Sequence, residues 1–291
     1  MKVLILGSTG QLGQSLLRFK PEDCEILSPN KHELDFYNGT NLCNYVIKHA
    51  PDWIINAAAY TDVNKAEKER SVAADVNHGG PASLAWGCNI SGSKLLQIST
   101  DYVFDGLSTR PYTTADLPNP LNYYGHTKLK GEQAIADIMR TGSYCILRSS
   151  WLYSAVRRNF FKTILDSLIR KKFLSVVNDQ IGCPTSVDAL SAVCWQIIKT
   201  QTMGLYHYSE APAMSWFDFA LKIRALAANS KLFDELGSVD PVSTADYDSM
   251  VFRPAYSALD NTELAEAMEL PEQDWEKSLK TVFYDLVLPV S

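Results

Sequence analysis

The stretch Lys2–Gly13, which reads KVLILGSTGQLG, decides the fold. Its first five residues form a continuous, mostly apolar run, which predicts a buried strand of a parallel sheet. Gly7, Gly10 and Gly13 come next, and a helical pattern follows them. Gly7 permits a tight turn, Gly10 lets the backbone approach a diphosphate, and Gly13 lets the helix pack close to the strand. The stretch therefore predicts a dinucleotide-binding turn, with the spacing G-x-x-G-x-x-G in place of G-x-G-x-x-G.

Strands and helices alternate along the first half of the chain. Apolar runs predict further strands at 25–27, 53–55, 95–98 and 144–147. This alternation predicts an α/β protein with a Rossmann-type doubly wound parallel sheet. We assign residues 1–150 to this domain and expect the segment 186–201 to return to it. Residues 151–291 are expected to form mainly a smaller C-terminal substrate-binding lobe.

Helices between these strands follow from the spacing of apolar residues. We predict helices at 64–70 and 76–91, and we expect Val76, Leu84 and Trp86 of the second to face the sheet. A further helix is predicted over 127–139.

Composition bounds the class of protein. The chain has 291 residues, of which 46% are hydrophobic and 21% charged, as in ordinary globular proteins. A net charge of −6 argues against nucleic acid as a partner. The first apolar run is too short for a signal peptide or a membrane span, so no membrane partner is expected.

Cysteine and histidine usage bears on compartment and metal. Six cysteines are scattered without a C-x-x-C pair, which is typical of reduced thiols in the cytoplasm. The five histidines show no metal-ligand spacing, so we predict no catalytic metal.

The end of the second predicted strand bears on the cofactor. An Asp or Glu at this position binds the ribose 2′-hydroxyl in NAD-specific sites. Here Ser28, Asn30 and Lys31 are neutral or basic and could accept a 2′-phosphate. The pattern favours NADPH, with NADH as an alternative. The other interpretation of Lys31 is an exposed loop charge.

Two more segments are candidates for cofactor contact. Asp35 and Phe36 suit the edge and face of an adenine, but Asp35 could equally cap the helix predicted at 39–49. Ala57–Ala59 and Thr61 follow the third strand, where small residues leave room for a flat ligand. Close packing of a helix on the sheet would explain the alanines as well.

The stretch from Leu95 to Glu132 carries the candidate chemistry. Its strand ends at Ser99 and Thr100, and only one of these side chains can face a cleft because strand side chains alternate. Tyr124 and Lys128 are four residues apart, so they share one helix face. We expect the ammonium to lower the pKa of the phenol from about 10 toward neutrality, so that it can transfer a proton. A solvated helix face is the alternative.

These motifs together resemble the dTDP-4-dehydrorhamnose reductase family, an extended branch of the short-chain dehydrogenase/reductase superfamily. The resemblance covers nearly the whole chain, and its most specific strings are S-T-D-Y-V-F and N-D-Q-x-G-x-P-T. The matching segments are Gly7–Gly13, Asn56–Thr61, Ser99–Phe104, Tyr124–Lys128, Arg148–Trp151, Asn178–Thr185 and Arg253-Pro254.

The resemblance implies hydride transfer from NADPH or NADH to C4 of a nucleotide-linked 4-keto-6-deoxysugar, giving dTDP-L-rhamnose. In the family scheme Tyr124 protonates the C4 alkoxide, Lys128 holds the nicotinamide ribose, and Thr100 polarises the carbonyl. By motif position Thr100, not Ser99, is assigned to the cleft. The expected cofactor-binding residues are Gly7, Thr9, Gly10, Gln11, Leu12, Gly13, Asn30, Lys31, Asp35, Phe36, Ala57, Ala58, Ala59, Thr61, Tyr124 and Lys128.

The resemblance also implies how the nucleotide sugar is bound. Tyr102 and Trp151 match positions that touch the sugar, although an indole could also simply fill the core. Arg253 suits a diphosphate, because a guanidinium pairs with two oxygens. The expected substrate-binding residues are Thr100, Tyr102, Trp151, Asn178, Gln180 and Arg253.

The chain departs from the family at one place. Some members dimerise through a metal bound by acidic side chains, one of them in the first helix, where this chain has Gln14-Ser15-Leu16. We therefore expect neither that metal nor that dimer, while a homodimer of another kind stays open.

Two other functions fit most of the motifs. One is the reduction of another nucleotide-linked 4-keto-6-deoxysugar. The other is a non-catalytic NADP-binding regulatory subunit, similar to the β subunit of methionine adenosyltransferase. The intact set of Thr100, Tyr124 and Lys128 argues against the second.

Overall fold

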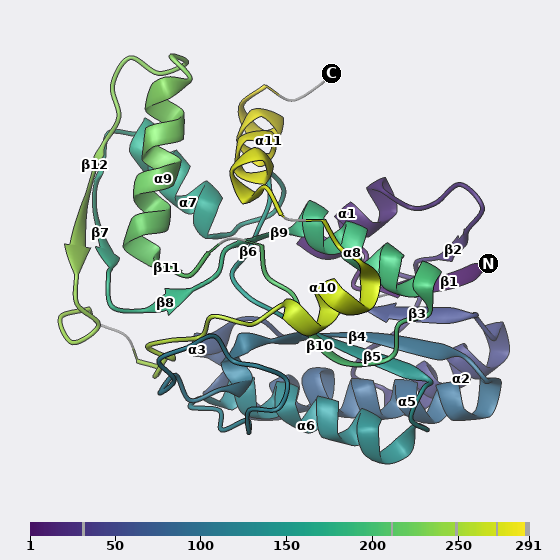
Figure 1. Ribbon diagram of the computed structural model, residues 1–291. Coiled ribbons are helices and arrows are strands. Elements are labelled where there is room, and N and C mark those ends of the chain that lie inside the picture. The colour runs from purple at the N-terminus through teal and green to yellow at the C-terminus, as the bar shows by residue number, and fades with distance from the viewer. Residues whose placement is uncertain (31–32, 211, 248–249, 272, 289–291) are drawn as a thin grey trace.

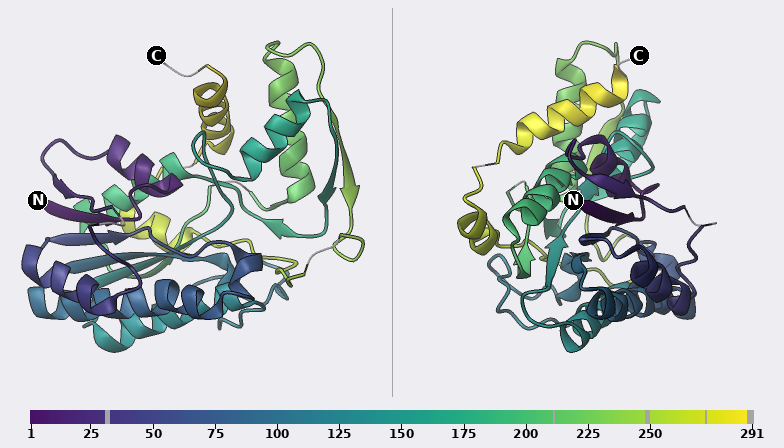
Figure 2. Two further views of the ribbon diagram at one scale, coloured as in Figure 1. Left: turned by 180° about the vertical axis from the view of Figure 1, so that it is seen from behind. Right: turned by 90° about the vertical axis from the view of Figure 1, so that its right-hand side faces the viewer.

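The computed structural model describes residues 1–291 except 31–32, 211, 248–249, 272 and 289–291. A six-stranded sheet with helices on both faces forms the larger part, and a smaller lobe of helices and short strands rises beside it (Figures 1 and 2).

The large sheet is entirely parallel, with strand order β10-β5-β4-β3-β1-β2. Its strands are β1 Lys2–Leu6, β2 Glu25–Leu27, β3 Trp53–Asn56, β4 Lys94–Thr100, β5 Tyr144–Ser149 and β10 Gly204–His207. Because β1 lies between β2 and β3, the chain winds outward from β1 in both directions. The predicted doubly wound sheet is confirmed, and ligands of such sheets bind where the strand order reverses.

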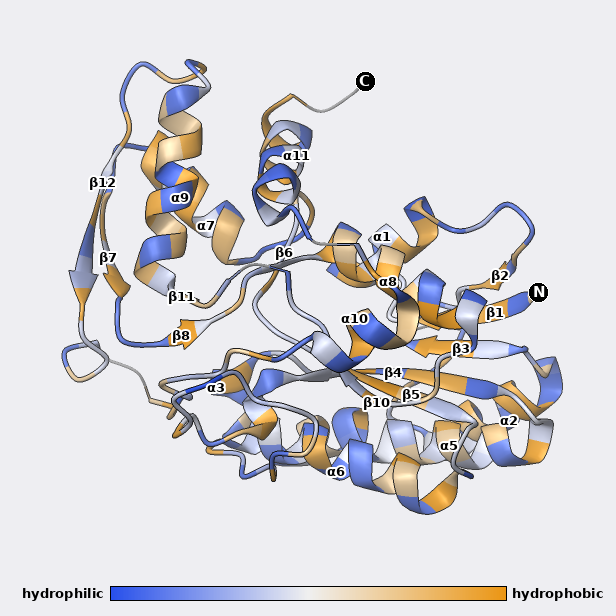
Figure 3. Ribbon diagram, in the orientation of Figure 1, coloured by the Kyte–Doolittle hydropathy of each residue, from blue (hydrophilic) through white to orange (hydrophobic). Residues whose placement is uncertain are grey.

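Alternate residues of β1 build the two layers of the core. Val3 and Ile5 share a cluster with residues of α1, α8 and α10, while Leu4 and Leu6 share one with residues of α2, α5 and α6. These helices are α1 Gln11–Arg18, α8 Val187–Thr200, α10 Thr262–Met268, α2 Gly39–His49, α5 Gly80–Ser91 and α6 Tyr123–Ile138. Figure 3 shows the hydrophobic residues along the central strands. In the described part of the chain, no helix is both long and apolar enough to cross a membrane.

The segment between β3 and β4 differs from its prediction. It forms α3 Val63–Ala66, α4 Arg70–Ala74, a π-helical turn η1 Asp75–Gly79, and then α5. Leu84 is fully buried, but Trp86 is 56% exposed, so the expectation that Trp86 faces the sheet is wrong. Side chains two positions apart on an α-helix point about 200° away from each other, so Leu84 and Trp86 cannot share a face.

The helix that carries the candidate tyrosine begins earlier than predicted. Its first residue is Tyr123, not residue 127, because Asn122 caps it: the Asn122 side chain accepts a hydrogen bond from the Gly125 amide at 2.9 Å. Tyr124 and Lys128 therefore both lie within α6, one turn apart.

The smaller lobe has a separate apolar core, to which Phe161, Phe219 and Phe283 contribute. Ser215 and Asp218 form a capping box at the start of α9. The elements of this part are α7 Phe160–Ile169, α9 Trp216–Asn229, α11 Trp275–Val287, the parallel pairs β7 Phe173–Val177 with β12 Ser238–Val242 and β6 Leu152–Tyr153 with β9 Thr185–Ser186, and the antiparallel pair β8 Ile181–Gly182 with β11 Met214–Ser215.

Candidate functional site

A cleft with a volume of about 530 Å³ lies where the carboxyl ends of the sheet strands meet the smaller lobe. The cleft is lined by residues at or just beyond the ends of β1, β3, β4 and β5. Two residues of α6 and residues of the lobe complete the lining. The lining residues are Gly10, Gln11, Leu12, Ala57, Ala58, Ala59, Thr61, Val63, Ile98, Ser99, Thr100, Asp101, Tyr102, Tyr124, Lys128, Ser149, Ser150, Trp151, Leu152, Arg157, Arg158, Trp216 and Arg253.

The glycine turn has the geometry of a phosphate cradle. Gly7 has φ +77°, and a Cβ there would lie 2.6 Å from the Ala58 amide nitrogen. A Cβ at Gly13 would collide with the carbonyl oxygen of Gly7, so only glycine lets α1 lie this close to the turn. Gly10 stands at the N-cap of α1 and no side chain caps that helix, which leaves its first amides for an anionic ligand.

Of the predicted residues after β2 that the structure describes, Ser28 and Asn30 do not line the cleft. Lys31 is outside the described residues. The Asn30 amide donates to the Glu33 carboxylate at 2.8 Å, and its side-chain oxygen accepts from the Glu33 amide at 3.3 Å. The part that Asn30 and Lys31 play in binding a 2′-phosphate stays a prediction.

Asp35 and Phe36 are also placed by the structure. Asn38 caps α2, so the alternative in which Asp35 caps this helix is wrong. The Asp35 carboxylate instead accepts from the Tyr37 amide at 2.9 Å. Phe36 packs against the apolar layer beneath the sheet. Neither residue lines the cleft, and their contact with adenine stays a prediction.

The alanines after β3 line the cleft, and a buried asparagine shapes their turn. The Asn56 side-chain oxygen accepts from the Ala58 amide at 3.2 Å, and its amide group donates to Gln97 at 2.8 Å. Ala57–Ala59 and Thr61 thus border the same cavity as the glycine turn. Two of the alanines also have the packing role that was the alternative interpretation: Ala57 packs against one apolar layer and Ala58 against the other.

The three candidate catalytic residues meet in this cleft. Burial raises the pKa of the Tyr124 phenol, and its hydrogen bond with Thr100 opposes that shift only in part. The Lys128 ammonium donates to the carbonyl oxygen of Ile98 at 2.7 Å, and burial lowers its pKa to about 8. The expectation that Lys128 brings the pKa of Tyr124 toward neutrality is therefore wrong for this arrangement, because desolvation dominates.

Ser99 and Thr100 have different partners, although both border the cleft. Ser99 donates its hydroxyl proton to the Glu132 carboxylate, behind the cleft. The Thr100 hydroxyl donates to Asp101 Oδ1 at 3.1 Å and accepts from the Tyr102 amide at 3.2 Å. Thr100 is thus the hydroxyl next to Tyr124, as the motif predicts.

A buried ion pair supports this region from below. Arg148 of β5 and Glu132 of α6 are joined at 2.6 Å, with side chains only 3% and 6% exposed. Glu132 is one turn beyond Lys128 and opposes the lowering of the lysine's pKa. His207 lies beside Arg148, and its Nδ1–H donates to the carbonyl oxygen of Tyr112 at 2.9 Å. Burial lowers the pKa of His207 to about 4.

Asp101 is a fully buried carboxyl in the cleft that sequence analysis left without a function. It accepts from the Ser257 hydroxyl at 2.6 Å in addition to Thr100. Burial raises its pKa to about 6. The signal was present in the sequence, since Asp101 follows directly on the strand end that carries Thr100.

Aromatic residues form the side of the cleft that belongs to the lobe. Trp151 stacks on Trp216 with ring centroids 3.4 Å apart and planes within 5°, and Gly182 leaves room for its indole. Trp151 has φ +47°, a conformation that is rare without glycine and often found at functional sites. Tyr102 packs edge-on against Tyr124, with ring centroids 5.8 Å apart. The phenol of Tyr102 is hydrogen-bonded to Arg253, although burial still raises its pKa to about 12.

A second cavity, of about 370 Å³, adjoins the cleft and shares Trp216 and Arg253 with it. Gln180 lines this second cavity and donates to the Thr244 hydroxyl at 3.0 Å. Asn178 is exposed and borders neither cavity, so the structure does not bring it together with the other predicted residues.

Several lining residues were missed by sequence analysis. Ser149 ends β5 and Ser150 follows it, so the rule that ligands bind at the carboxyl ends of the strands points to both. Trp216, Arg157 and Arg158 belong to no recognised motif, and only the folded chain brings them to the cleft.

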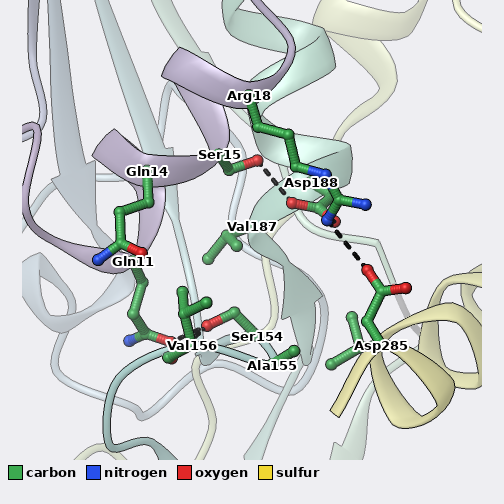
Figure 4. A pocket seen from close by; sticks show the side chains of 11 residues that line it. Gln11, Gln14, Ser15, Arg18, Ser154, Ala155, Val156, Val187, Asp188 and Asp285 are labelled. Carbon is green, nitrogen blue, oxygen red and sulfur yellow. Dashed lines mark hydrogen bonds and ion pairs between the residues drawn. The ribbon is translucent and has the colours of Figure 1, made fainter. Parts of the chain in front are cut away.

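The acidic residues near the first helix hold no candidate metal site. Ser15 donates to Asp188 at 2.6 Å, and Arg18 pairs with Asp285 at 3.0 Å and with Asp188 at 3.8 Å (Figure 4). Within the described ranges, no group of three or more His, Cys, Asp or Glu could hold a metal ion.

Comparison with known proteins places this architecture among nucleotide-sugar enzymes. The family model described as RmlD substrate binding domain matches residues 1–288. The chain is 37% identical to a dTDP-4-dehydrorhamnose reductase of Aggregatibacter actinomycetemcomitans over 97% of this chain and 98% of the relative. It is 32% identical to a dTDP-4-keto-6-deoxy-D-glucose reductase of Streptomyces niveus, over 96% of each chain. A crystal structure of dTDP-4-dehydrorhamnose reductase from Bacillus anthracis in complex with NADP is 37% identical and superposes with a TM-score of 0.91 over 98% of this chain and 99% of that one.

Proposed function

This chain belongs to the family of the RmlD substrate binding domain, and we propose that it is the NADPH-dependent reductase that converts the C4 ketone of dTDP-4-dehydro-L-rhamnose into the alcohol of dTDP-L-rhamnose. The observation that carries the proposal is the meeting of Thr100, Tyr124 and Lys128 with the glycine turn around one cleft. Since the product, dTDP-L-rhamnose, is a nucleotide sugar, we propose that the reaction serves the synthesis of cell-surface polysaccharides.

The residues around the turn fit a dinucleotide. The glycine cradle and the uncapped start of α1 suit its diphosphate, and the alanines after β3 leave room for a flat ring. NADPH, when bound, supplies the hydride for C4. We propose the cofactor-binding set that the sequence predicts. Asn30, Lys31, Asp35 and Phe36 stay predictions for the adenosine half, and NADH stays the alternative cofactor.

Tyr124 is the proposed proton donor. Its phenol is neutral because burial raises its pKa, so it carries the proton that the C4 alkoxide needs. Thr100 polarises the ketone by turning its hydroxyl from Asp101 to the substrate oxygen, while Asp101 keeps the hydrogen bond from Ser257. Lys128 stays mostly protonated below a pH of about 8 and thereby favours negative charge on the neighbouring phenol as the proton leaves.

The nucleotide sugar is proposed to lie on the lobe side. Trp151 offers an apolar face to the sugar and Tyr102 its phenol, while Arg253 pairs with the diphosphate. Gln180 is proposed to contact the nucleoside in the second cavity. Asn178 stays a predicted substrate contact at the end of β7.

Cofactor binding and substrate binding are assigned to different parts of the chain. We assign cofactor binding to residues 1–150 and substrate binding mainly to 151–291. The segment 186–201 belongs with the first part, since residues of α8 share the apolar layer of β1 and α1. The proposed compartment is the cytoplasm, which suits six unpaired cysteines, and the proposed assembly is a monomer or homodimer with no membrane or nucleic-acid partner.

The direct test is NADPH consumption by the purified chain, followed by absorbance, with product identified by NMR. We expect oxidation with dTDP-4-dehydro-L-rhamnose, and a higher kcat/KM than with dTDP-4-keto-6-deoxy-D-glucose. The opposite preference would identify a sister reductase. Tight NADPH binding without oxidation in the presence of either sugar would favour the regulatory subunit.

A further inference from the structure

The loop between β6 and α7 carries two arginines, Arg157 and Arg158, which are exposed and line the cleft. Within the part of the chain that the structure describes, neither has a carboxylate within ion-pair distance. Lys128 donates to Ile98 and Arg253 to Tyr102, whereas the hydrogen bond that the structure gives Arg157 uses only its Nε. A guanidinium that lies at the glycine turn without a carboxylate, in a cleft that takes diphosphate-bearing ligands, calls for an anionic partner, and of the two arginines this is Arg157.

The loop is held against the start of α1. Gln11 accepts hydrogen bonds from the Ser154 hydroxyl at 2.7 Å and from the Asn159 amide group at 2.9 Å. The Asn159 amide group also donates to the Ser154 carbonyl at 2.9 Å, which closes the loop on itself. The loop is therefore positioned by the same helix that begins at the glycine turn.

Arg157 has a left-handed backbone, with φ +58°. A non-glycine residue in this region costs about 1–2 kcal/mol, and the cost is absent for glycine. Other non-glycine residues of the chain share this conformation, so a function of Arg157 is inferred from what its side chain contacts. Its Nε donates to the carbonyl oxygen of Thr9 at 2.9 Å, between Gly7 and Gly10.

We propose that Arg157 binds the diphosphate that joins the two nucleosides of the cofactor; this rests on the proposed function. The bond to Thr9 anchors the guanidinium through Nε and leaves its two Nη groups for phosphate oxygens. The diphosphate is then held by neutral amides at the start of α1 and by one full positive charge from the loop.

The nucleotide sugar carries the same chemical group, but the geometry favours the cofactor. Arg157 contacts the glycine turn itself, whereas Arg253 stands with Tyr102 and Trp216 on the lobe side of the cleft. Each diphosphate thus has its own arginine. Arg158, the neighbour in sequence, has no hydrogen bond to the turn and serves as the matched control.

The test is the Kd of NADPH and of NADH, measured by fluorescence titration without sugar, for the unchanged chain and for Arg157→Gln and Arg158→Gln. Loss of a charge-assisted pair costs about 1.5–3 kcal/mol, so Arg157→Gln should weaken both cofactors about 10- to 150-fold and by the same factor. Arg158→Gln should leave both Kd values nearly unchanged. Arg157→Lys keeps the positive charge but lacks the paired N–H donors of the guanidinium, so it should bind more tightly than Arg157→Gln and more weakly than the unchanged chain.

Arg157→Gly separates binding from folding, because glycine relieves the backbone while removing the guanidinium. We expect it to melt at the same temperature or higher and to bind the cofactors as weakly as Arg157→Gln. Affinity equal to that of the unchanged chain would overturn the proposal. So would a loss confined to NADPH, which would indicate the 2′-phosphate, or unchanged cofactor Kd values with a raised KM for the sugar, which would indicate the other diphosphate. If the unchanged chain binds no dinucleotide, the proposed function fails as well.

Discussion

The two sides of the cleft are built in different ways. On the side of the sheet, Thr100, Asp101 and Lys128 are buried, and the polar groups of these three residues have partners within the chain. On the side of the lobe, Arg157 and Arg158 are exposed and the indoles of Trp151 and Trp216 are half-buried. A buried, paired network fixes the groups that must meet the reacting atoms, because reorganising them during reaction is costly. On the exposed side, the Nη groups of Arg157 are proposed to gain their partner from a ligand. The following predictions test this contrast, from the largest effect to the smallest.

The largest effect is expected from breaking the ion pair under the sheet side. Glu132→Gln leaves the Arg148 charge buried without its carboxylate, which should lower the free energy of unfolding by about 3–5 kcal/mol. Urea denaturation measures this loss. Asp285→Asn breaks the pair with Arg18, whose side chain is 59% exposed, and should cost less than about 1 kcal/mol. If both variants lose the same free energy of unfolding, the buried pair is no more important than the exposed one, and the contrast fails.

Tyr124→Phe removes the phenolic hydroxyl, which is the proposed proton donor and a hydrogen-bond partner of Thr100, and keeps the ring. We expect kcat to fall at least about 100-fold, the usual scale for a positioned acid, while the Kd of NADPH stays near normal. Single-turnover kinetics and fluorescence titration measure the two quantities. Retained turnover would mean that another group donates the proton.

The pH dependence of kcat/KM should reveal Lys128. Burial lowers its pKa to about 8, so the ammonium is charged below that pH and neutral above it. Activity should therefore decline as the pH rises through about 8. Because the folded state binds this proton less tightly than the unfolded chain does, stability should rise over the range from there to the ordinary lysine pKa.

The same profile has an internal control. Glu132 opposes the lowering of the Lys128 pKa, so in Glu132→Gln the falling limb should move to lower pH. If the falling limb of the kcat/KM profile stays at the same pH in Glu132→Gln, a group other than Lys128 is responsible for it.

The smallest effect is expected on the lobe side. Trp216→Ala removes the partner that stacks on Trp151, an interaction worth about 0.5–1.5 kcal/mol, so KM for the sugar should rise about 2- to 12-fold. The Kd of NADPH should not change. Trp275→Ala is the matched control, since this indole packs in the lobe and does not line the cleft. A fall in kcat as large as that of Tyr124→Phe would show that the lobe shapes the chemical step.

Sequence analysis succeeded where the signal is local. The strand and glycine turn of Lys2–Gly13 and the pair Tyr124–Lys128 depend on spacings within one or two turns, and the structure has them as predicted. Trp86 was misplaced although its signal is also local, because the prediction put residues two apart on one helix face.

Other features depend on contacts that no local pattern encodes. Trp216 stacks on a residue that precedes it by a long stretch of chain, and Arg157 reaches back to Thr9 from 148 residues away. The pKa of Tyr124 was predicted in the wrong direction because spacing reports a neighbouring charge but not the depth of burial.

The ends of the large sheet have a consequence for self-association. The sheet finishes on one side with β2, of three residues, and on the other with β10, of four. Such brief outer strands offer few unpaired amides, so a second copy gains little by extending the sheet. Strand-on-strand assembly through this sheet is disfavoured for the same reason, and a dimer of this chain would have to dock through another part of its surface.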